Sequence, residues 1–200
     1  MKLTYSPASP FARKVLVLLH ETGQIEDVEI LNVTTTPLSP SAEVKASNPL
    51  AKIPALERND GPALYDSRVI CAYLDDRAGG MLYGGGWDSK VLEATADGIM
   101  DAAILMAYEK RLRPEEKQWD GWLDAQRSKV LGGCAALNAR WMSHLLGPLD
   151  IGQIAVACAL GYVDLRHPDA GWRQGNEALA EWFAGFESRP SMQATKPPAG

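Results

Sequence analysis

The sequence predicts an α/β N-terminal domain, a βαβ unit followed by a ββα unit, and then an all-α helical domain. Strand-like and helix-like segments alternate over the first part of the chain. Glycines interrupt this pattern at Gly79–Gly80 and Gly84–Gly86, and beyond Trp87 nearly every segment has helical periodicity. We therefore expect one domain over residues 1–77 and a second over residues 88–200.

A serine lies where the first strand gives way to the first helix. Lys2–Tyr5 alternates like a strand, and apolar residues recur at helical spacing behind Pro10, a residue favoured in a first helical turn. Ser9 is therefore the expected N-cap. Its hydroxyl would lie beside unpaired N–H groups and the positive end of the helix dipole, which stabilise an anion. An ordinary capping serine without chemistry explains the same local pattern.

The remaining strands of the first domain follow from apolar runs and one turn signal. Val28–Val33 is the next expected strand, and Ile53–Glu57 and Ala63–Tyr65 are expected to form a hairpin. The Asp-Gly pair within Arg58–Pro62 marks a tight turn between them. Asp66–Ser67 then opens another helix, which gives a second place for an anion.

The second half reads as long helices. We expect helices over roughly 88–111, 115–146, 150–164 and 174–188. Asp150 and Gln153 have the spacing of a capping box with a structural role. All six tryptophans belong to this half, and we expect most of them to anchor the core. The tail over residues 196–200 should be loose.

Composition excludes several classes of function. A net charge of -5, a pI near 5.2 and the lack of a dense Lys/Arg run argue against nucleic acid as a partner. The N-terminal region lacks the layout of a signal peptide, and no segment approaches membrane-spanning length, so we expect a cytoplasmic protein with no membrane partner. The three cysteines are widely spaced among apolar residues and the three histidines are scattered, so we expect neither a disulfide nor a metal site.

Three motifs, in order, resemble the cytosolic glutathione S-transferase family, and the resemblance extends over essentially the whole chain. Ser9–Ala12 looks like the Cys-Pro-x-x segment of glutaredoxins and omega-type transferases, with serine in the cysteine position. Asn48–Leu56 is similar to the family segment that ends in a cis-proline, and Tyr65–Ile70 matches its acidic-Ser turn. The resemblance is to bacterial, serine-type members and implies that the first domain is thioredoxin-like.

The resemblance implies a glutathione site in this first domain. A cis Ile53–Pro54 bond would turn the Ile53 backbone outward to pair with glutathione as a strand would. Asp66 would face the γ-glutamyl ammonium, and the Ser67 hydroxyl would meet the neighbouring carboxylate. Lys52 is a candidate for the glycine carboxylate, although an exposed lysine is by default solvated surface.

The resemblance also implies a transferase that uses glutathione as co-substrate and holds no permanently bound cofactor. Ser9 would be the catalytic residue and stabilise the glutathione thiolate, which attacks an electrophilic carbon; Ser6 is the rival hydroxyl. Since Ser9 is not cysteine, it cannot form a mixed disulfide itself. A glutathione-dependent disulfide or peroxide reductase and a non-catalytic glutathione-fold binding module remain as alternatives.

The helical domain is expected to contribute the pocket for a small electrophile. Candidates for this second-substrate pocket are Phe11, Met106, Tyr108 and Arg111, although most such apolar residues would simply be core. A role in detoxification and a homodimer are implied by the resemblance alone.

Overall fold

The computed structural model describes residues 1–198 and divides into two compact units. Met1–Gly84 and Pro190–Pro198 form the first unit, and Gly85–Arg189 forms the second. The division therefore comes at Gly84, between the domains expected over 1–77 and 88–200, while the segment after Arg189 packs with the first unit. The end of the tail expected to be loose, residues 199 and 200, lies outside the described residues.

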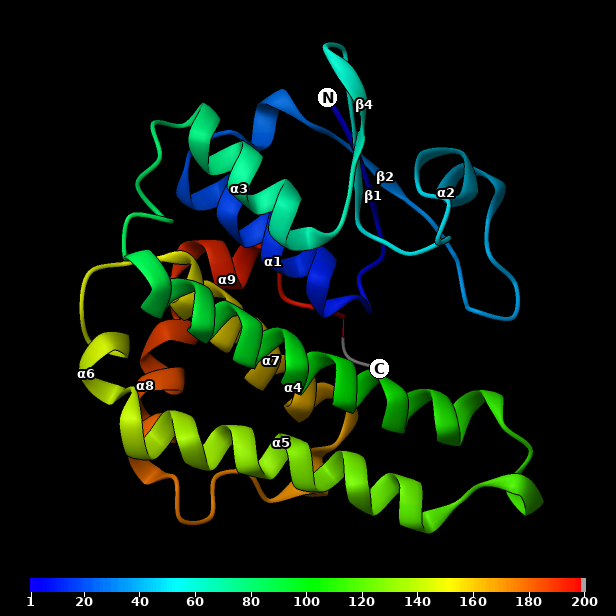
Figure 1. Cartoon of the computed structure of the whole chain (residues 1–200), viewed down its shortest axis with the longest axis vertical. Helices are drawn as coiled ribbons and strands as arrows, with labels where there is room; N and C mark the ends of the chain where they lie inside the picture. Colours follow the sequence, from blue (N-terminus) through cyan, green and yellow to red (C-terminus); the bar gives the residue numbers. More distant parts are fainter. Residues whose placement is uncertain (199–200) are drawn as a thin grey trace. The chain divides into compact units, whose positions relative to one another are not determined.

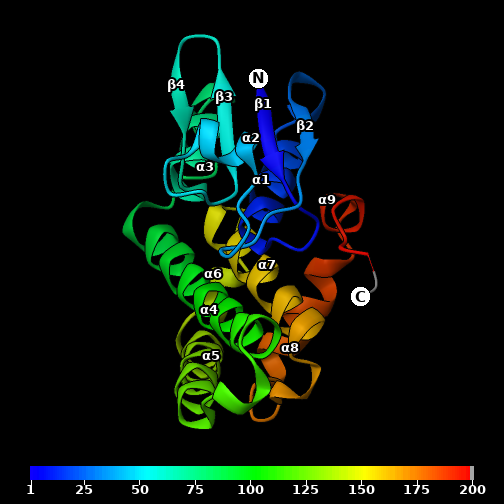
Figure 2. The ribbon, with the colours of Figure 1, turned by 90° about the vertical axis from the view of Figure 1, so that its right-hand side faces the viewer.

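The first unit is built on a four-stranded mixed sheet. Its strands are β1 (Lys2–Tyr5), β2 (Glu29–Asn32), β3 (Ala55–Arg58) and β4 (Gly61–Leu64). They lie in the order β2-β1-β3-β4, with β1 parallel to β2 and antiparallel to β3, and β3 antiparallel to β4 (Figure 2). The predicted βαβ-ββα arrangement is confirmed, and we call this part the thioredoxin-like unit.

Helices cover both faces of this sheet. They are α1 (Pro10–Glu21), α2 (Ala42–Ser47) and α3 (Ser67–Arg77). The unit also contains the C-terminal α9 (Pro190–Ala194), which packs against α1, and a short 3-10 turn η1 at Ile25–Asp27. Helices α1 and α3 lie on one face and α2 on the other (Figure 1). Fully buried aliphatic side chains fill the space between α1, α3 and the strands, among them Leu3, Val15, Leu18, Leu56, Ile70 and Leu74. Burial of this apolar surface stabilises the unit.

Arg13 ties the C-terminal helix to α1. The Arg13 side chain is buried, and its Nη2 donates to the Met192 carbonyl at 3.0 Å while its Nε reaches the Thr195 hydroxyl at 3.4 Å. Hydrogen bonds to a charged guanidinium are stronger than neutral ones. This contact holds the segment after Arg189 against the thioredoxin-like unit, to which the sequence alone did not assign it.

The predicted hairpin forms, but its turn is one residue earlier than the Asp-Gly signal indicated. Asn59 and Asp60 make the two-residue loop, and Gly61 is already the first residue of β4. The Arg58 side chain lies across Gly61, where a Cβ atom would come within 2.6 Å of Arg58 Nη2. The glycine therefore leaves room for the Arg58 side chain, although this flexible side chain could move aside for a Cβ atom.

The second unit, the helical unit, is made of helices alone within residues 85–189. These are α4 (Gly86–Leu112), α5 (Asp120–Arg140), α6 (Met142–Leu145), α7 (Ile151–Arg166) and α8 (Glu177–Glu187), with 3-10 turns η2 at Glu115–Lys117 and η3 at Pro168–Ala170. Helix α7 is buried along most of its length and packs against α4. No helix among residues 1–198 is both long enough and apolar enough to cross a bilayer.

Two expectations for this unit were wrong. The single helix expected over 115–146 is divided, because Trp141 has φ -117° and ψ 0° and ends α5 before the short α6 begins. The tryptophans are not mostly core residues: Trp172 and Trp182 are buried, whereas Trp87 and Trp119 are 77% and 67% exposed. The sequence shows that a segment is helical and contains tryptophan, but not which other helix packs over that side chain.

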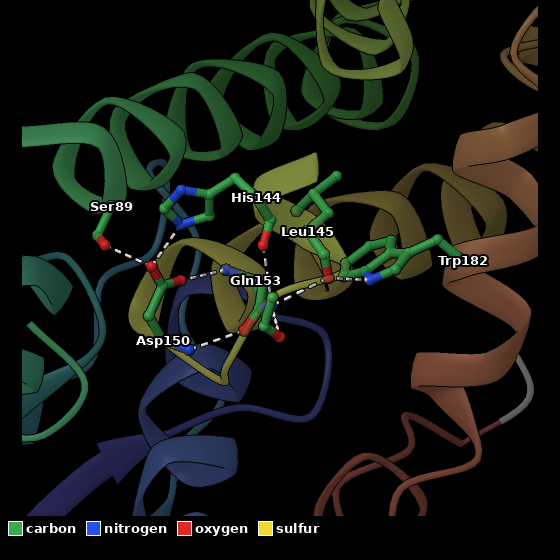
Figure 3. Close-up of polar contacts among 7 residues, drawn as sticks. Ser89, His144, Leu145, Asp150, Gln153 and Trp182 are labelled. Carbon is green, nitrogen blue, oxygen red and sulfur yellow. Dashed lines mark hydrogen bonds and ion pairs between the residues drawn. The ribbon is translucent and has the colours of Figure 1, made fainter. Parts of the chain in front are cut away.

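The capping box predicted at the start of α7 is confirmed and is part of a larger polar cluster (Figure 3). Asp150 Oδ1 accepts from the Gln153 N–H at 3.1 Å, and Gln153 Oε1 accepts from the Asp150 N–H at 2.7 Å. Asp150 Oδ2 also accepts from the Ser89 hydroxyl and lies 2.6 Å from His144 Nε2. One buried carboxylate therefore joins α4, α6 and α7.

The remaining donors of this cluster satisfy the carbonyls where α6 ends. Gln153 Nε2 donates to Leu145 O at 2.9 Å and Gly147 O at 3.1 Å, and Trp182 Nε1 from α8 donates to Leu145 O at 2.8 Å. Unpaired carbonyls in a buried helix end cost free energy, so these bonds stabilise the turn between α6 and α7.

We expect Asp150→Ala to lower the free energy of unfolding by about 2–4 kcal/mol. The variant loses an N-cap, which contributes about 0.5–2 kcal/mol, and hydrogen bonds to a charged group, which contribute about 1.5–3 kcal/mol. Urea unfolding followed by circular dichroism measures the change. Asp124→Ala is the matched control, because Asp124 is exposed on α5 and should change stability by less than about 0.5 kcal/mol. Equal stability of the two variants would contradict this role of Asp150.

Candidate functional site

Ser9 begins α1 as its N-cap, as predicted. The Ser9 Oγ accepts a hydrogen bond from the Ala12 N–H at 3.2 Å, and Pro10 occupies the first helical turn. Because the oxygen is the acceptor in this bond, the hydroxyl hydrogen is left to donate to another group. The Phe11 N–H, in the same first turn, has no hydrogen-bond partner among residues 1–198. The helix start therefore presents a hydroxyl and a backbone donor together.

The Ile53–Pro54 peptide bond is cis, which confirms the prediction from the motif. Pro54 is buried, and Ala55 after it is held by Thr4: the Thr4 Oγ accepts from the Ala55 N–H at 2.9 Å and donates to the Ala55 carbonyl at 3.1 Å. Ile53 lies before β3, and neither its N–H nor its carbonyl is paired within the described part of the chain. Both groups are therefore free to pair with an extended peptide.

Asn48 shapes the loop that leads to Ile53. The buried Asn48 side chain accepts from the Leu50 N–H and donates to the Lys52 carbonyl, both at 2.9 Å, and the Asn48 carbonyl accepts from the Ala51 N–H. Ala51 has a positive φ of 53°. The loop is in neither a helix nor a strand, so the Asn48 side chain supplies the hydrogen bonds to its backbone instead. Lys52 itself is exposed.

Asp66 and Ser67 begin α3. Asp66 is the N-cap and accepts from the Arg68 N–H at 3.0 Å, and the Tyr65–Asp66 peptide bond before it is also cis. Ser67 is 3% exposed, and its hydroxyl has no hydrogen-bond partner among the residues described. The Ser67 N–H is likewise unpaired there. A hydroxyl and a backbone donor therefore lie at the positive end of a helix, beside a carboxylate.

The Asp66 carboxylate is held in its ionised form. Partial burial raises its pKa, but hydrogen bonds from the Arg68 side chain and backbone, together with the Arg68 and Lys14 charges, outweigh burial and hold the pKa below its ordinary value of 3.8. Arg68 Nη2 lies 3.2 Å from Asp66 Oδ2, in an ion pair that is largely exposed. Asp66 is therefore a negative charge at neutral pH and suits an ammonium ligand.

Sheet topology brings these three segments to one edge. Strand β1 runs toward Ser9, and its antiparallel neighbour β3 starts after Pro54, with Thr4 opposite Ala55. Strand β4 is antiparallel to β3 and ends before Asp66, with Leu64 opposite Leu56. The end of β1, the start of β3 and the end of β4 therefore share an edge of the sheet. This arrangement collects Ser9, Ile53 and Ser67 with the residues beside them.

The residues predicted to line a second-substrate pocket are divided between the units. Phe11 is half-buried on α1 of the thioredoxin-like unit. Met106 is buried on α4 of the helical unit, where Tyr108 is half-buried and Arg111 is exposed. Their role in a pocket stays a prediction.

Two residues of the candidate site were missed from the sequence. Thr4 and Asn48 are both buried and position the segment around Pro54 by the hydrogen bonds described above. Asn48 precedes a proline, a pair typical of turns, and this signal could have identified it. For Thr4 the sequence holds no such signal, because its partner is 51 residues away.

The three cysteines, Cys71, Cys134 and Cys158, are free and buried. Burial raises the pKa of Cys134 to about 12, which leaves it a thiol at neutral pH. No group of histidine, cysteine and carboxylate side chains within residues 1–198 has the geometry of a metal site.

Comparison with known proteins shows the family of the chain. The domain described as "Glutathione S-transferase, N-terminal domain" matches residues 8–77, and "Glutathione S-transferase, C-terminal domain" matches residues 120–185. An uncharacterized GST-like protein of Escherichia coli K12, YibF, is 32% identical over 99% of both chains. The chain belongs to the glutathione S-transferase family.

Solved structures of relatives contain ligands. A glutathione transferase family member from Pseudomonas fluorescens Pf-5, crystallised with bound glutathione, is 48% identical over 98% of both chains, with a TM-score of 0.95. A family member from the same organism with bound S-(propanoic acid)-glutathione is 47% identical over 99% of this chain and all of that one, with a TM-score of 0.91. A glutathione S-transferase from Methylobacillus flagellatus KT with glutathione bound is 36% identical over 98% of both chains, with a TM-score of 0.82.

We expect Asn48→Ala to lower the free energy of unfolding by about 1–3 kcal/mol, because the Leu50 N–H and the Lys52 carbonyl both lose their partner. Hydrogen exchange should accelerate at the Leu50 amide in particular. Asn32→Ala is the control, since Asn32 is exposed at the end of β2 and its side chain makes no hydrogen bond with the described residues. Unchanged exchange at Leu50 in Asn48→Ala would contradict this account of the loop.

Proposed function

We propose that this protein is a glutathione transferase in which Ser9 stabilises the glutathione thiolate and promotes its attack on an electrophilic substrate. The observation that carries the proposal is the geometry of the first turn of α1. The Ser9 oxygen is engaged by the Ala12 N–H, so the hydroxyl hydrogen is available to a thiolate, and the Phe11 N–H is a second donor beside it.

Glutathione binding would use the sheet edge that collects the other segments. The unpaired N–H and carbonyl of Ile53, before cis-Pro54, would pair with the tripeptide backbone as a strand does. Asp66 would face the γ-glutamyl ammonium, and the Ser67 hydroxyl and N–H would meet the adjacent carboxylate. Lys52 would approach the glycine carboxylate. Relatives with glutathione bound support this assignment.

The free energies are sufficient without a cationic base. A thiol with a pKa of about 8.5 needs roughly 2 kcal/mol of preference for the thiolate to be half ionised at pH 7. A hydrogen bond to a charged group contributes about 1.5–3 kcal/mol, and a helix N-terminus about 0.3–1 kcal/mol. The contributions of Ser9 and of the N-terminus of α1 together therefore reach the preference of about 2 kcal/mol that is needed.

The reaction follows from a stabilised thiolate. The sulfur donates an electron pair to an electrophilic carbon and forms a carbon–sulfur bond, and a leaving group departs with its electron pair, or a proton is taken up if the electrophile is an alkene. Ser9 acts as a donor throughout and forms no covalent bond. The relative with S-(propanoic acid)-glutathione, a thioether conjugate, supports carbon as the site of attack.

We also propose a substrate pocket, an oligomeric state and a cellular location for this protein. Family membership supports an electrophile pocket lined by Phe11, Met106, Tyr108 and Arg111, a homodimer, a detoxifying role and a cytoplasmic location. A glutathione-dependent reductase would use the same thiolate against sulfur or oxygen. Parallel assays with an aryl halide, a mixed disulfide and a hydroperoxide separate the two chemistries, and a transferase converts the aryl halide fastest relative to the uncatalysed rate.

We expect Ser9→Ala to raise the pKa of bound glutathione by about 1–2 pH units, because one hydrogen bond to the thiolate is lost. Titration of the thiolate absorbance in the ultraviolet measures this pKa for the unmodified protein and the variant. Glutathione affinity at low pH, where the thiol is neutral in both, should change little.

Ser6→Ala is the matched control for this titration, because Ser6 is the other hydroxyl of the loop and its carbonyl, not its side chain, bonds the Ser9 N–H at 2.9 Å. The thiolate pKa should be the same in Ser6→Ala as in the unmodified protein. A pKa that rises in Ser6→Ala and not in Ser9→Ala would assign the activation to Ser6.

We expect Asp66→Asn to weaken binding of S-methylglutathione about 2- to 5-fold, the size typical of an exposed ion pair with good geometry. In the unmodified protein this affinity should be constant between pH 7 and pH 5, because the pKa of Asp66 lies below its ordinary value and the carboxylate stays ionised. Calorimetry at several pH values tests both statements. A loss of affinity between pH 7 and pH 5 that Asp66→Asn abolishes would contradict them.

A further inference from the structure

We propose that Tyr108, Arg111, Tyr162 and Arg166 of the helical unit form a binding site for a carboxylate. We call these four residues the tyrosine–arginine cluster. The site would give the second substrate its class, a small electrophile that carries a carboxylate; that link to the reaction rests on the proposed function, whereas anion binding by the cluster does not.

Two packed helices bring the cluster together. Tyr108 and Arg111 lie one turn apart on α4, and Tyr162 and Arg166 lie one turn apart on α7. The helices α4 and α7 pack against each other. The Tyr162 phenol is buried, and its pKa responds to the Arg166 side chain as a hydrogen-bond partner and to the ionisable side chains of Tyr108 and Arg111 nearby. The four side chains are therefore neighbours.

Among residues 1–198, the arginines of the cluster have no carboxylate partner. Neither Arg111 nor Arg166 forms an ion pair with a described residue, and Arg166 Nε is shielded from solvent without any hydrogen-bond partner there. A buried unpaired donor on a charged group is costly, so such groups normally have a partner.

The acidic side chains beside the cluster on the same two helices are engaged elsewhere. Asp164 accepts from Trp172 Nε1 at 2.7 Å and from both terminal nitrogens of Arg173 at 2.6 Å. Glu109 lies 2.8 Å from Arg113 Nε and also accepts from the Trp119 N–H. Neither carboxylate is the missing partner of Arg166.

The surroundings are positive, although the whole chain has a net charge of -5. Burial lowers the pKa of His167, and the nearby charges of Lys110, Arg127 and Arg166 lower it further. Burial also raises the pKa of Tyr162 to about 12, so its hydroxyl is a donor at neutral pH. Cations and hydroxyl donors thus converge in one region of the helical unit, and an anion is the ligand that complements them.

The chemistry of the donors favours a carboxylate. A guanidinium presents two parallel N–H groups that match the two oxygens of a carboxylate, and a phenol adds a single donor. Arg111 is exposed, Tyr108 is half-buried and Tyr162 is buried, so the cluster extends from the surface inward.

The test is equilibrium binding of one isomer of chloronitrobenzoate and the corresponding chloronitrobenzamide to the full chain, by calorimetry without glutathione. The two probes have the same shape and differ in charge. We expect the acid to bind at least about 10-fold more tightly than the amide, since charge-assisted hydrogen bonds to arginine favour the anion. Equal affinity for the two probes would overturn the proposal.

Substitutions in the cluster test whether these residues cause the preference for the acid over the amide. Arg166→Gln should remove most of the preference for the acid over the amide. Arg111→Gln should reduce the preference in the same direction, and because Arg111 is exposed this variant should fold normally. Arg140→Gln, an exposed arginine near the end of α5, is the matched control and should keep the full preference. A preference that survives in both cluster variants would place the anion elsewhere and overturn the assignment.

A separate glutathione titration of the unmodified protein distinguishes the two proposals. If the acid is preferred and glutathione does not bind, the carboxylate site stands and the proposed transferase function fails. If glutathione binds as a thiolate and the two probes bind equally, the transferase function stands and the carboxylate site fails.

Discussion

The antiparallel pairing of β3 with both β1 and β4 is the constraint on which the candidate site depends. Thr4 anchors this pairing, because its buried hydroxyl bonds both the N–H and the carbonyl of Ala55 directly after cis-Pro54. Since β3 runs opposite to its neighbours, its start lies at the same edge as the ends of β1 and β4. Two helix N-termini and the Ile53 backbone, which is unpaired within residues 1–198, therefore lie at one edge of the sheet.

Backbone N–H and carbonyl groups at this edge of the sheet have fewer hydrogen-bond partners than those at the helix ends of the helical unit. In the helical unit, Asp150 and Gln153 bond the backbone groups where α6 ends and α7 begins. At the sheet edge, by contrast, Ile53 and the first turn of α1 keep donors and acceptors with no partner among residues 1–198. Backbone donors and acceptors without a partner in the chain can hydrogen-bond a polar, extended ligand. Glutathione, a tripeptide, is such a ligand.

The sequence predicted those features whose interacting residues are close together in the chain and missed those whose partners are far apart in it. Ser9 and Asp150 were identified because a helix cap and its partner lie within four residues of each other. The hydrogen bonds of Thr4 were not, because they join segments distant in sequence. Most of the six tryptophans were expected in the core, although Trp87 and Trp119 are exposed. Arg166 on α7 and Tyr108 on α4 could not be placed in one region until the packing of these two helices was known.

The central claim is that the Ile53 backbone pairs with glutathione at the edge of the sheet. Hydrogen exchange at the Ile53 amide, measured by NMR with and without saturating S-methylglutathione, tests this most directly, because the probe has no thiol to titrate. The account predicts that exchange at Ile53 slows by at least about 10-fold on binding, as for an amide that gains a strand-like hydrogen bond. Binding of the probe with unchanged exchange at Ile53 would contradict it.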